Sequence, residues 1–89
     1  MVEKKVTIRN KLGLHARAAV RFVNLANRFS SGVKVVKDGN EIDGKSILGI
    51  LTLAATQRSQ ITLKISGADE NAALKTLVAL INNKFDEKE

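Results

Sequence analysis

The chain of 89 residues contains no cysteine, no proline, no tryptophan and no tyrosine. Without cysteine, it can form no disulfide, no thiolate nucleophile and no cysteine-ligated zinc site. Its single histidine, His15, also excludes a metal site built from several histidines, and we expect neither a metal nor a cofactor. The three phenylalanines are its only aromatic residues, so it lacks the tyrosine and tryptophan side chains on which nucleic-acid bases commonly stack.

Long apolar segments are also absent. No stretch approaches the ~20 apolar residues of a membrane-spanning helix, and the first residues, MVEKKVTIR, lack the apolar segment of a signal peptide. With 44% apolar and 27% charged residues, the composition is typical of a globular chain. We therefore expect a soluble cytoplasmic protein without membrane contact, folded as a single domain over residues 1–89.

Negative charge is in short supply, because 15 lysines and arginines stand against 9 aspartates and glutamates and give a formal net charge of +6. This excess favours acidic partners, which include nucleic acid, anionic lipid and acidic proteins, without choosing between them. A small basic nucleic-acid-binding domain is therefore one function that the charge allows and the scarcity of aromatic residues disfavours.

Two segments alternate between apolar and polar residues. Residues 2–8 place Val2, Val6 and Ile8 on one face, which predicts a half-buried strand. The sequence ITLKI at residues 61–65 alternates in the same way and predicts a second strand.

A hairpin is predicted between these two strands. The pair Asp38-Gly39 is typical of a tight turn, because both residue types tolerate positive φ. The turn predicts one strand beginning at Val33 and a short return strand over residues 40–43.

Residues 16–29 have the spacing of a helix with one apolar stripe. The stripe consists of Ala18, Ala19, Phe22, Val23, Leu25, Ala26 and Phe29. The opposite face carries Arg17, Arg21, Asn24 and Arg28. We expect the sequence SSG at residues 30–32 to end this helix.

Two further helices are predicted in the second half of the chain. Residues 47–55, ILGILTLAA, suit a strand or a helix by length, and Ser46 as an N-cap favours a short helix. A long helix is predicted from Asp69 to about Phe85, with Lys84 near its end, where the helix dipole favours positive charge. Its apolar face consists of Ala73, Leu74, Leu77, Val78, Ile81 and Phe85.

The resulting order is β-α-β-β-α-β-α. Helices that join strands in this order usually pack on one face of an antiparallel sheet. We therefore predict an α+β fold, an open-faced β-sandwich in which a four-stranded antiparallel sheet carries three helices on one face.

His15 lies immediately before the first predicted helix. The first N–H groups of a helix have no internal partner and favour an anion. Arg17 on the first turn can add a charge-assisted hydrogen bond to a phosphate oxygen, and a neutral imidazole is a nucleophile at cellular pH. These groups together suit a phosphoryl group held on His15, although an exposed or capping histidine beside a solvated arginine face explains the same residues.

Ser46 also has two interpretations. It can simply cap the helix that follows it. A phosphate on Ser46 would also be tolerated at a helix start, and would place about two negative charges beside Ile47, Leu48 and Leu51. If these apolar side chains are exposed, they form a docking surface from which an acidic partner would be repelled.

Three segments resemble the histidine-containing phosphocarrier family of the bacterial phosphotransferase system, the HPr family. They are GLHARAA at residues 13–19, GKSILGIL at 44–51 and SGADENAAL at 66–74. The resemblance covers essentially the whole chain, and it implies a monomeric phosphoryl carrier that is not itself an enzyme. It implies that His15 accepts a phosphoryl group on Nδ1 from phosphorylated enzyme I and passes it to EIIA-type domains, while Arg17 steadies the phosphate.

The resemblance also implies a partner surface and a regulatory site. The partner surface would include, besides Arg17, the residues Ala19, Val20, Phe22, Ile47, Leu48, Leu51 and Thr52, although Phe22 also belongs to the predicted core stripe. Ser46 matches the position that an ATP-dependent HPr kinase/phosphorylase modifies in bacteria that possess one, and KSILGIL is similar to the segment that this kinase recognises.

The chain departs from the family in a few places. Many relatives have proline at the position of Ala18 and glycine at the positions of Ala54 and Ala55. Neither change removes a reactive group. Residues 54–60, AATQRSQ, are less like the common sugar-transport members, so a regulatory or nitrogen-branch HPr-like signalling protein, not coupled to sugar uptake, is the alternative within the family.

Overall fold

The predicted four-stranded antiparallel sheet is present in the computed structural model of the protein, which describes residues 1–88. The strands are β1 (Val2–Thr7), β2 (Gly32–Lys37), β3 (Asn40–Asp43) and β4 (Gln60–Ser66). They lie in the order β1-β4-β2-β3, so that β4 pairs with β1 on one side and with β2 on the other. The sheet therefore depends on contacts between segments that are distant in the sequence.

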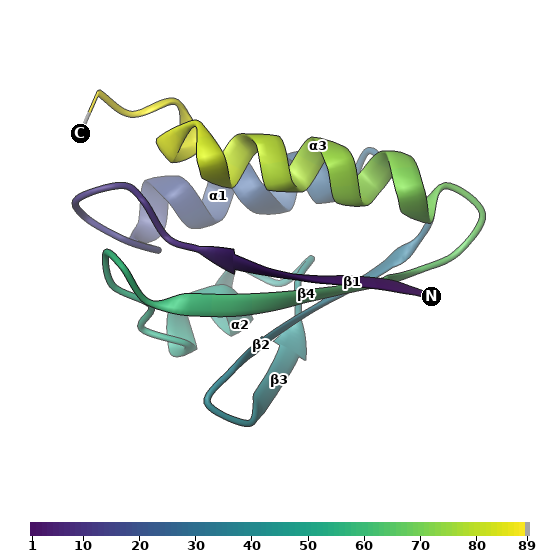
Figure 1. Ribbon diagram of the computed structural model, residues 1–89, viewed down its shortest axis with the longest axis horizontal. Helices are drawn as coiled ribbons and strands as arrows, with labels where there is room; N and C mark the ends of the chain where they lie inside the picture. Colours follow the sequence, from purple (N-terminus) through teal and green to yellow (C-terminus); the bar gives the residue numbers. More distant parts are fainter. Residues whose placement is uncertain (89) are drawn as a thin grey trace.

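The helices are α1 (Ala16–Ala26), α2 (Ile47–Thr52) and α3 (Glu70–Asn82), followed by a short 3-10 turn, η1 (Lys84–Asp86). Figure 1 shows α1 and α3 side by side over one face of the sheet, while the C-terminal segment returns toward the start of α1. The short α2 packs against α1 and beside β3. The element order and the open-faced arrangement agree with the prediction.

One hydrophobic core lies between the sheet and the helices. The alternating strand residues point into it, as predicted, with Ile61, Leu63 and Ile65 at most 2% exposed. The apolar stripe of α1 meets them through Phe22, which is 1% exposed. Phe85 is completely buried although it lies beyond α3, and it fixes the C-terminal segment to the rest of the protein.

The predicted hairpin is confirmed. Strands β2 and β3 pair from Lys37 with Asn40 outward, and Asp38 and Gly39 between them have φ values of 51° and 82°. Positive φ at both central residues is the geometry that matches the twist of a two-residue hairpin.

All three helices end earlier than predicted. Helix α1 stops at Ala26 rather than at residue 29, α2 at Thr52 rather than at residue 55, and α3 at Asn82 rather than near Phe85. After α2 the chain turns at Ala54 with a φ of 50°, and after α3 at Lys84 with a φ of 58°. Lys84 thus lies outside the last turn of α3, and the predicted interaction of its positive charge with the helix dipole is wrong.

Candidate functional site

The loop before α1 is held tightly against the segment that follows α2. The N–H of Leu14 donates to the carbonyl of Ala55 at 2.9 Å. Gly13 has a φ of +68°, and a Cβ at its position would lie only 2.3 Å from the same carbonyl oxygen. The absence of a side chain at Gly13 therefore allows the close approach that places His15 at the start of α1.

His15 is the N-cap residue of α1, with extended backbone angles of φ −80° and ψ 178°. Its carbonyl accepts the first helical hydrogen bond, from Ala19 N–H at 2.9 Å. Within residues 1–88, the amides of residues 16–18 have no hydrogen-bond partner. His15, with its side chain 26% exposed, is thus the residue next to the unpaired donors at the positive end of the helix dipole.

The ring of His15 is held on one side by a carboxylate from the C-terminal segment. Nε2 of His15 lies 2.5 Å from Oε2 of Glu87, whose side chain is 12% exposed. The other oxygen of Glu87 accepts a hydrogen bond from Nδ2 of Asn10 at 2.8 Å. The same Nδ2 donates to the carbonyl of Gly13 at 2.7 Å, so the network joins the loop, the helix start and the C-terminal segment.

Burial is the largest single influence on the Glu87 carboxyl group, and it raises the pKa. The hydrogen bonds from Asn10 and His15, together with the electrostatic attraction of His15 and Arg21, outweigh burial and lower the pKa below its usual range. Glu87 is therefore ionised at neutral pH and can only accept hydrogen bonds. It follows that the hydrogen between Glu87 and His15 belongs to Nε2, which leaves the lone pair of the neutral ring on Nδ1.

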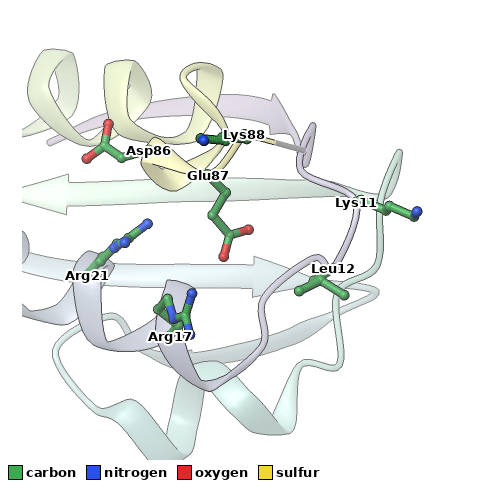
Figure 2. Close-up of a pocket in the computed structure, with 7 residues that line it drawn as sticks. All are labelled: Lys11, Leu12, Arg17, Arg21, Asp86, Glu87 and Lys88. Carbon is green, nitrogen blue, oxygen red and sulfur yellow. The ribbon is translucent and has the colours of Figure 1, made fainter.

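A pocket of about 440 Å³ opens beside this network. It is lined by Lys11, Leu12, Arg17, Arg21, Asp86, Glu87 and Lys88 (Figure 2). Four of these side chains are basic and two are acidic, so the lining favours an anion. Figure 2 shows the Glu87 side chain extending from the C-terminal segment toward the arginines on the first turns of α1.

The two arginines of this pocket differ in what they bind. The guanidinium of Arg21 donates to the carbonyl of Phe85 and so fastens the C-terminal segment to α1. Arg17 is exposed and makes no hydrogen bond or ion pair with residues 1–88. Of the two, Arg17 is therefore the arginine whose guanidinium has no partner within the described part of the chain.

Ser46 caps α2, as predicted. Its Oγ accepts a hydrogen bond from the N–H of Gly49 at 3.0 Å, and the residue is only partly buried. Ile47 and Leu48 follow it and are 38% and 76% exposed. The apolar side chains beside Ser46 are thus accessible.

Two residues predicted for the partner surface lie in the core instead. Ala19 is completely buried and Phe22 is 1% exposed, because this side of α1 packs on the sheet. Val20, one residue along the helix from Ala19, is 39% exposed. Leu51 is half-buried and Thr52 is exposed, so both border the accessible surface of α2.

Three residues of this region are absent from the sequence-based site. Asn10 and Glu87 hold the histidine ring or its loop, and Leu12, 67% exposed, extends the apolar surface near the pocket. Local pattern offers no signal for Asn10 or Glu87. An exposed leucine inside a polar loop, between Lys11 and Gly13, is the one feature that could have indicated Leu12.

Among residues 1–88, no three histidine, cysteine or acidic side chains gather in a way that could hold a metal ion. In the same range, every helix is too short or too polar to cross a membrane.

Comparisons with known proteins converge on one family. The family described as "PTS HPr component phosphorylation site" matches residues 2–83. The chain is 47% identical over 89 residues to a phosphocarrier protein HPr of Cupriavidus necator, with full coverage of both chains. It is 45% identical over 84 residues to an HPr-like protein Crh of Halalkalibacterium halodurans, covering 94% of this chain and 100% of that protein. The crystal structure of HPr from Thermoanaerobacter tengcongensis superposes with a TM-score of 0.96 at 45% identity, with full coverage of both chains.

Proposed function

The chain belongs to the HPr family of phosphocarrier proteins of the phosphotransferase system, and we propose that His15 is the residue on which it carries the phosphoryl group. As a member of this family it is a relay protein and not an enzyme, and the system in which it works is cytoplasmic. The observation that carries the assignment of His15 is the position of its ring, partly exposed beside unpaired helix amides. We further propose that residues 1–89 form one domain that acts as a monomer.

The expected chemistry is a direct transfer between two nitrogen atoms. The lone pair on Nδ1 of His15 attacks the phosphorus atom of phosphorylated enzyme I, and the donor's P–N bond breaks as the new one forms. The phosphoryl oxygens then face the free amides of residues 16–18, where the helix dipole stabilises negative charge. A second transfer of the same kind passes the group to an EIIA-type domain.

The proposed carrier function is tested by incubating the protein with enzyme I and phosphoenolpyruvate. A mass increase of one phosphate that is lost in acid and stable in base supports a phosphohistidine. If no phosphate is transferred, or if the product is stable in acid, the carrier function is refuted for this chain.

Replacing Arg17 with alanine is expected to slow phosphoryl acceptance from enzyme I by about tenfold. The exposed guanidinium is free to donate to a phosphate oxygen, and a charge-assisted hydrogen bond contributes roughly 1.5–3 kcal/mol. A difference of about 1.4 kcal/mol in the barrier already changes a rate tenfold. The measurement is the single-turnover rate with phosphorylated enzyme I in excess.

Arg28→Ala is the matched control for Arg17→Ala. Arg28 is also exposed, and its replacement by alanine removes the same charge. It lies just beyond the C-terminal end of α1, whereas His15 lies at the N-terminal end. We expect this variant to transfer at the wild-type rate, and both variants to unfold at the wild-type temperature. Equal rates for the two variants would remove Arg17 from the mechanism.

The surface proposed to dock enzyme I and the EIIA-type domains surrounds His15. It comprises the exposed or half-buried residues Leu12, Arg17, Val20, Ile47, Leu48, Leu51 and Thr52. Ala19 and Phe22 are not included, because neither reaches the surface. Apolar side chains with a basic residue beside them suit a partner whose surface is apolar and acidic.

We propose that Ser46 is a regulatory phosphorylation site for an HPr kinase/phosphorylase. It is partly accessible, its hydroxyl faces the start of α2, and it is next to Ile47 and Leu48 of the docking surface. A phosphate at this position adds charge where partners bind, while the unpaired amides of the helix start limit the cost to the fold.

Ser46→Asp is expected to weaken enzyme I binding about fivefold at low salt while leaving the fold intact. Aspartate is a good N-cap and adds one negative charge within the docking surface. Repulsion of about 1 kcal/mol between exposed charges near contact accounts for this factor. The dissociation constant is measured by calorimetry at low and high salt, since the difference should shrink as salt screens the charge.

Ser66→Asp serves as the control, because Ser66 is exposed at the end of β4 and belongs to no part of the docking surface. It makes the same change in residue and in net charge. If Ser46→Asp binds enzyme I as tightly as Ser66→Asp does, the repulsion argument fails and Ser46 remains only a helix cap.

A regulatory HPr-like protein is the second candidate, and its support is the 45% identity to a protein of that description, Crh. A signalling member of the nitrogen branch is included in this alternative. The two candidates differ in the fate of the phosphoryl group. A carrier passes it from His15 to EIIA-type domains of sugar transport, whereas a regulator binds its targets in a manner that depends on phosphorylation and supports no sugar uptake.

A further inference from the structure

We propose that Glu87 is a positioning residue for the reaction of His15: its carboxylate holds the hydrogen on Nε2, and thereby presents the lone pair of Nδ1 to the incoming phosphorus atom. This inference rests on the proposed role of His15 as the phosphoryl acceptor. It assigns a function in the transfer step to a residue 72 positions away in the sequence.

The hydrogen-bond geometry restricts the ring. The carboxylate of Glu87 has both oxygens engaged, one 2.5 Å from Nε2 of His15 and the other 2.8 Å from Nδ2 of Asn10. An ionised carboxylate has no hydrogen to give, so Nε2 must be the donor. Nδ1 has no hydrogen-bond partner among residues 1–88. Its lone pair is therefore available to act as the nucleophile.

The carboxylate is itself held in place from both sides. Two residues before Glu87, Phe85 is completely buried, and the carbonyl of Phe85 accepts a hydrogen bond from Arg21 on α1. On the other side, Asn10 is completely buried and joins Glu87 to the carbonyl of Gly13. Glu87 is thus anchored to the same two elements that carry His15, rather than moving freely on a terminal tail.

The charge of Glu87 also suits the product of the reaction. When Nδ1 bonds to phosphorus, the ring keeps its hydrogen on Nε2 and takes on the positive charge that the donor ring gives up. No proton has to move, because the P–N bond formed replaces the P–N bond broken. The Glu87 carboxylate then faces the positively charged ring. The attraction between them stabilises the phosphorylated ring until the phosphoryl group is passed on.

The test combines a spectroscopic readout with a rate. At a pH where the ring is neutral, the ¹⁵N shifts of the wild-type imidazole are expected to show hydrogen almost entirely on Nε2. In Glu87→Ala the hydrogen should distribute over both nitrogens, and single-turnover acceptance from phosphorylated enzyme I should slow about tenfold. Glu87→Gln retains a carbonyl oxygen that can accept from Nε2, so it should keep the wild-type preference and lose less rate than Glu87→Ala.

Glu3→Gln is the control for Glu87→Gln, because it makes the same change of side chain at an exposed residue of β1 that lies outside the pocket. We expect its tautomer ratio and rate to match the wild type. An unbiased ratio in the wild type overturns the inference, as does a Glu87→Ala variant with unchanged ratio, unchanged rate or both. The proposed function fails separately, if the wild type accepts no phosphate at all.

Discussion

His15→Gln is expected to accept no measurable phosphate from enzyme I, a loss of at least ~10³-fold in rate. Glutamine has no nucleophilic nitrogen, because its amide lone pair is delocalised into the carbonyl group. Its NH₂ group can still donate to the carboxylate of Glu87, which now accepts from Nε2 at 2.5 Å. The substitution therefore removes the reactive atom while keeping a donor for the network. The measurement is the acid-labile mass increase after incubation with enzyme I and phosphoenolpyruvate.

The control for His15→Gln is Ser46→Ala, which removes the second candidate acceptor and one capping hydrogen bond. This variant should gain the acid-labile phosphate as the wild type does, at a cost of about 1 kcal/mol in stability from the lost cap. A phosphate that persists in His15→Gln and disappears in Ser46→Ala would show that Ser46, and not His15, accepts the phosphoryl group. That result would refute the proposal. The unfolding temperatures of both variants show whether either result reflects unfolding.

The strands could be predicted from the sequence because their signal is local. Alternation with a period of two fixes the buried side of β4, where Ile61, Leu63 and Ile65 all face the core. The signal for the hairpin is equally local, since Asp38 and Gly39 alone specify the two positive φ values. Strand order is a different matter, because the pairing of β4 with both β1 and β2 joins segments for which the sequence contains no common pattern.

The helix ends were predicted too late, although asparagine, a residue type that often marks a helix end, directly follows α1 and α3 as Asn27 and Asn83. Ala54 and Lys84 adopt positive φ at 50° and 58°, in a region that favours glycine. Glycine at the position of Ala54, which the family resemblance led us to expect, would adopt this φ without strain. Tertiary contacts overcome the local preference. After α3, for example, the chain leaves the helical conformation and the ring of Phe85 becomes completely buried.

The candidate site was predicted in part, for a related reason. His15 and Arg17 could be named as candidates because they lie within three residues at a helix start, where the backbone itself favours an anion, and because GLHARAA at residues 13–19 resembles the HPr family. Glu87 is brought to His15 across 72 positions by the packing of α3 and η1, and its sequence context is an unpatterned polar tail. Ala19 and Val20 differ by one position, yet a rotation of about 100° around the helix separates the core from the surface.

Gly13→Ala is expected to destabilise the protein by about 3 kcal/mol and to slow phosphoryl acceptance as well. The added Cβ would lie 2.3 Å from the carbonyl oxygen of Ala55 and 2.9 Å from Cα of Thr56, and both are backbone atoms that cannot rotate away. Positive φ adds about 1 kcal/mol for a residue with a side chain, and forced overlap adds roughly 1–3 kcal/mol. The loop must then move, which breaks the 2.9 Å hydrogen bond from Leu14 to Ala55 and displaces His15. Denaturant unfolding measures the loss of stability.

Gly39→Ala separates the two causes, because Gly39 also has positive φ, at +82°, but a Cβ there would meet no atom within 4 Å. This variant should lose only the conformational part, about 1 kcal/mol, and should transfer phosphate at the wild-type rate because the hairpin turn is remote from His15. The excess loss in Gly13→Ala over Gly39→Ala then measures the close approach of the two backbones. If the two variants unfold at the same denaturant concentration, that contact does not hold the loop of His15 in place.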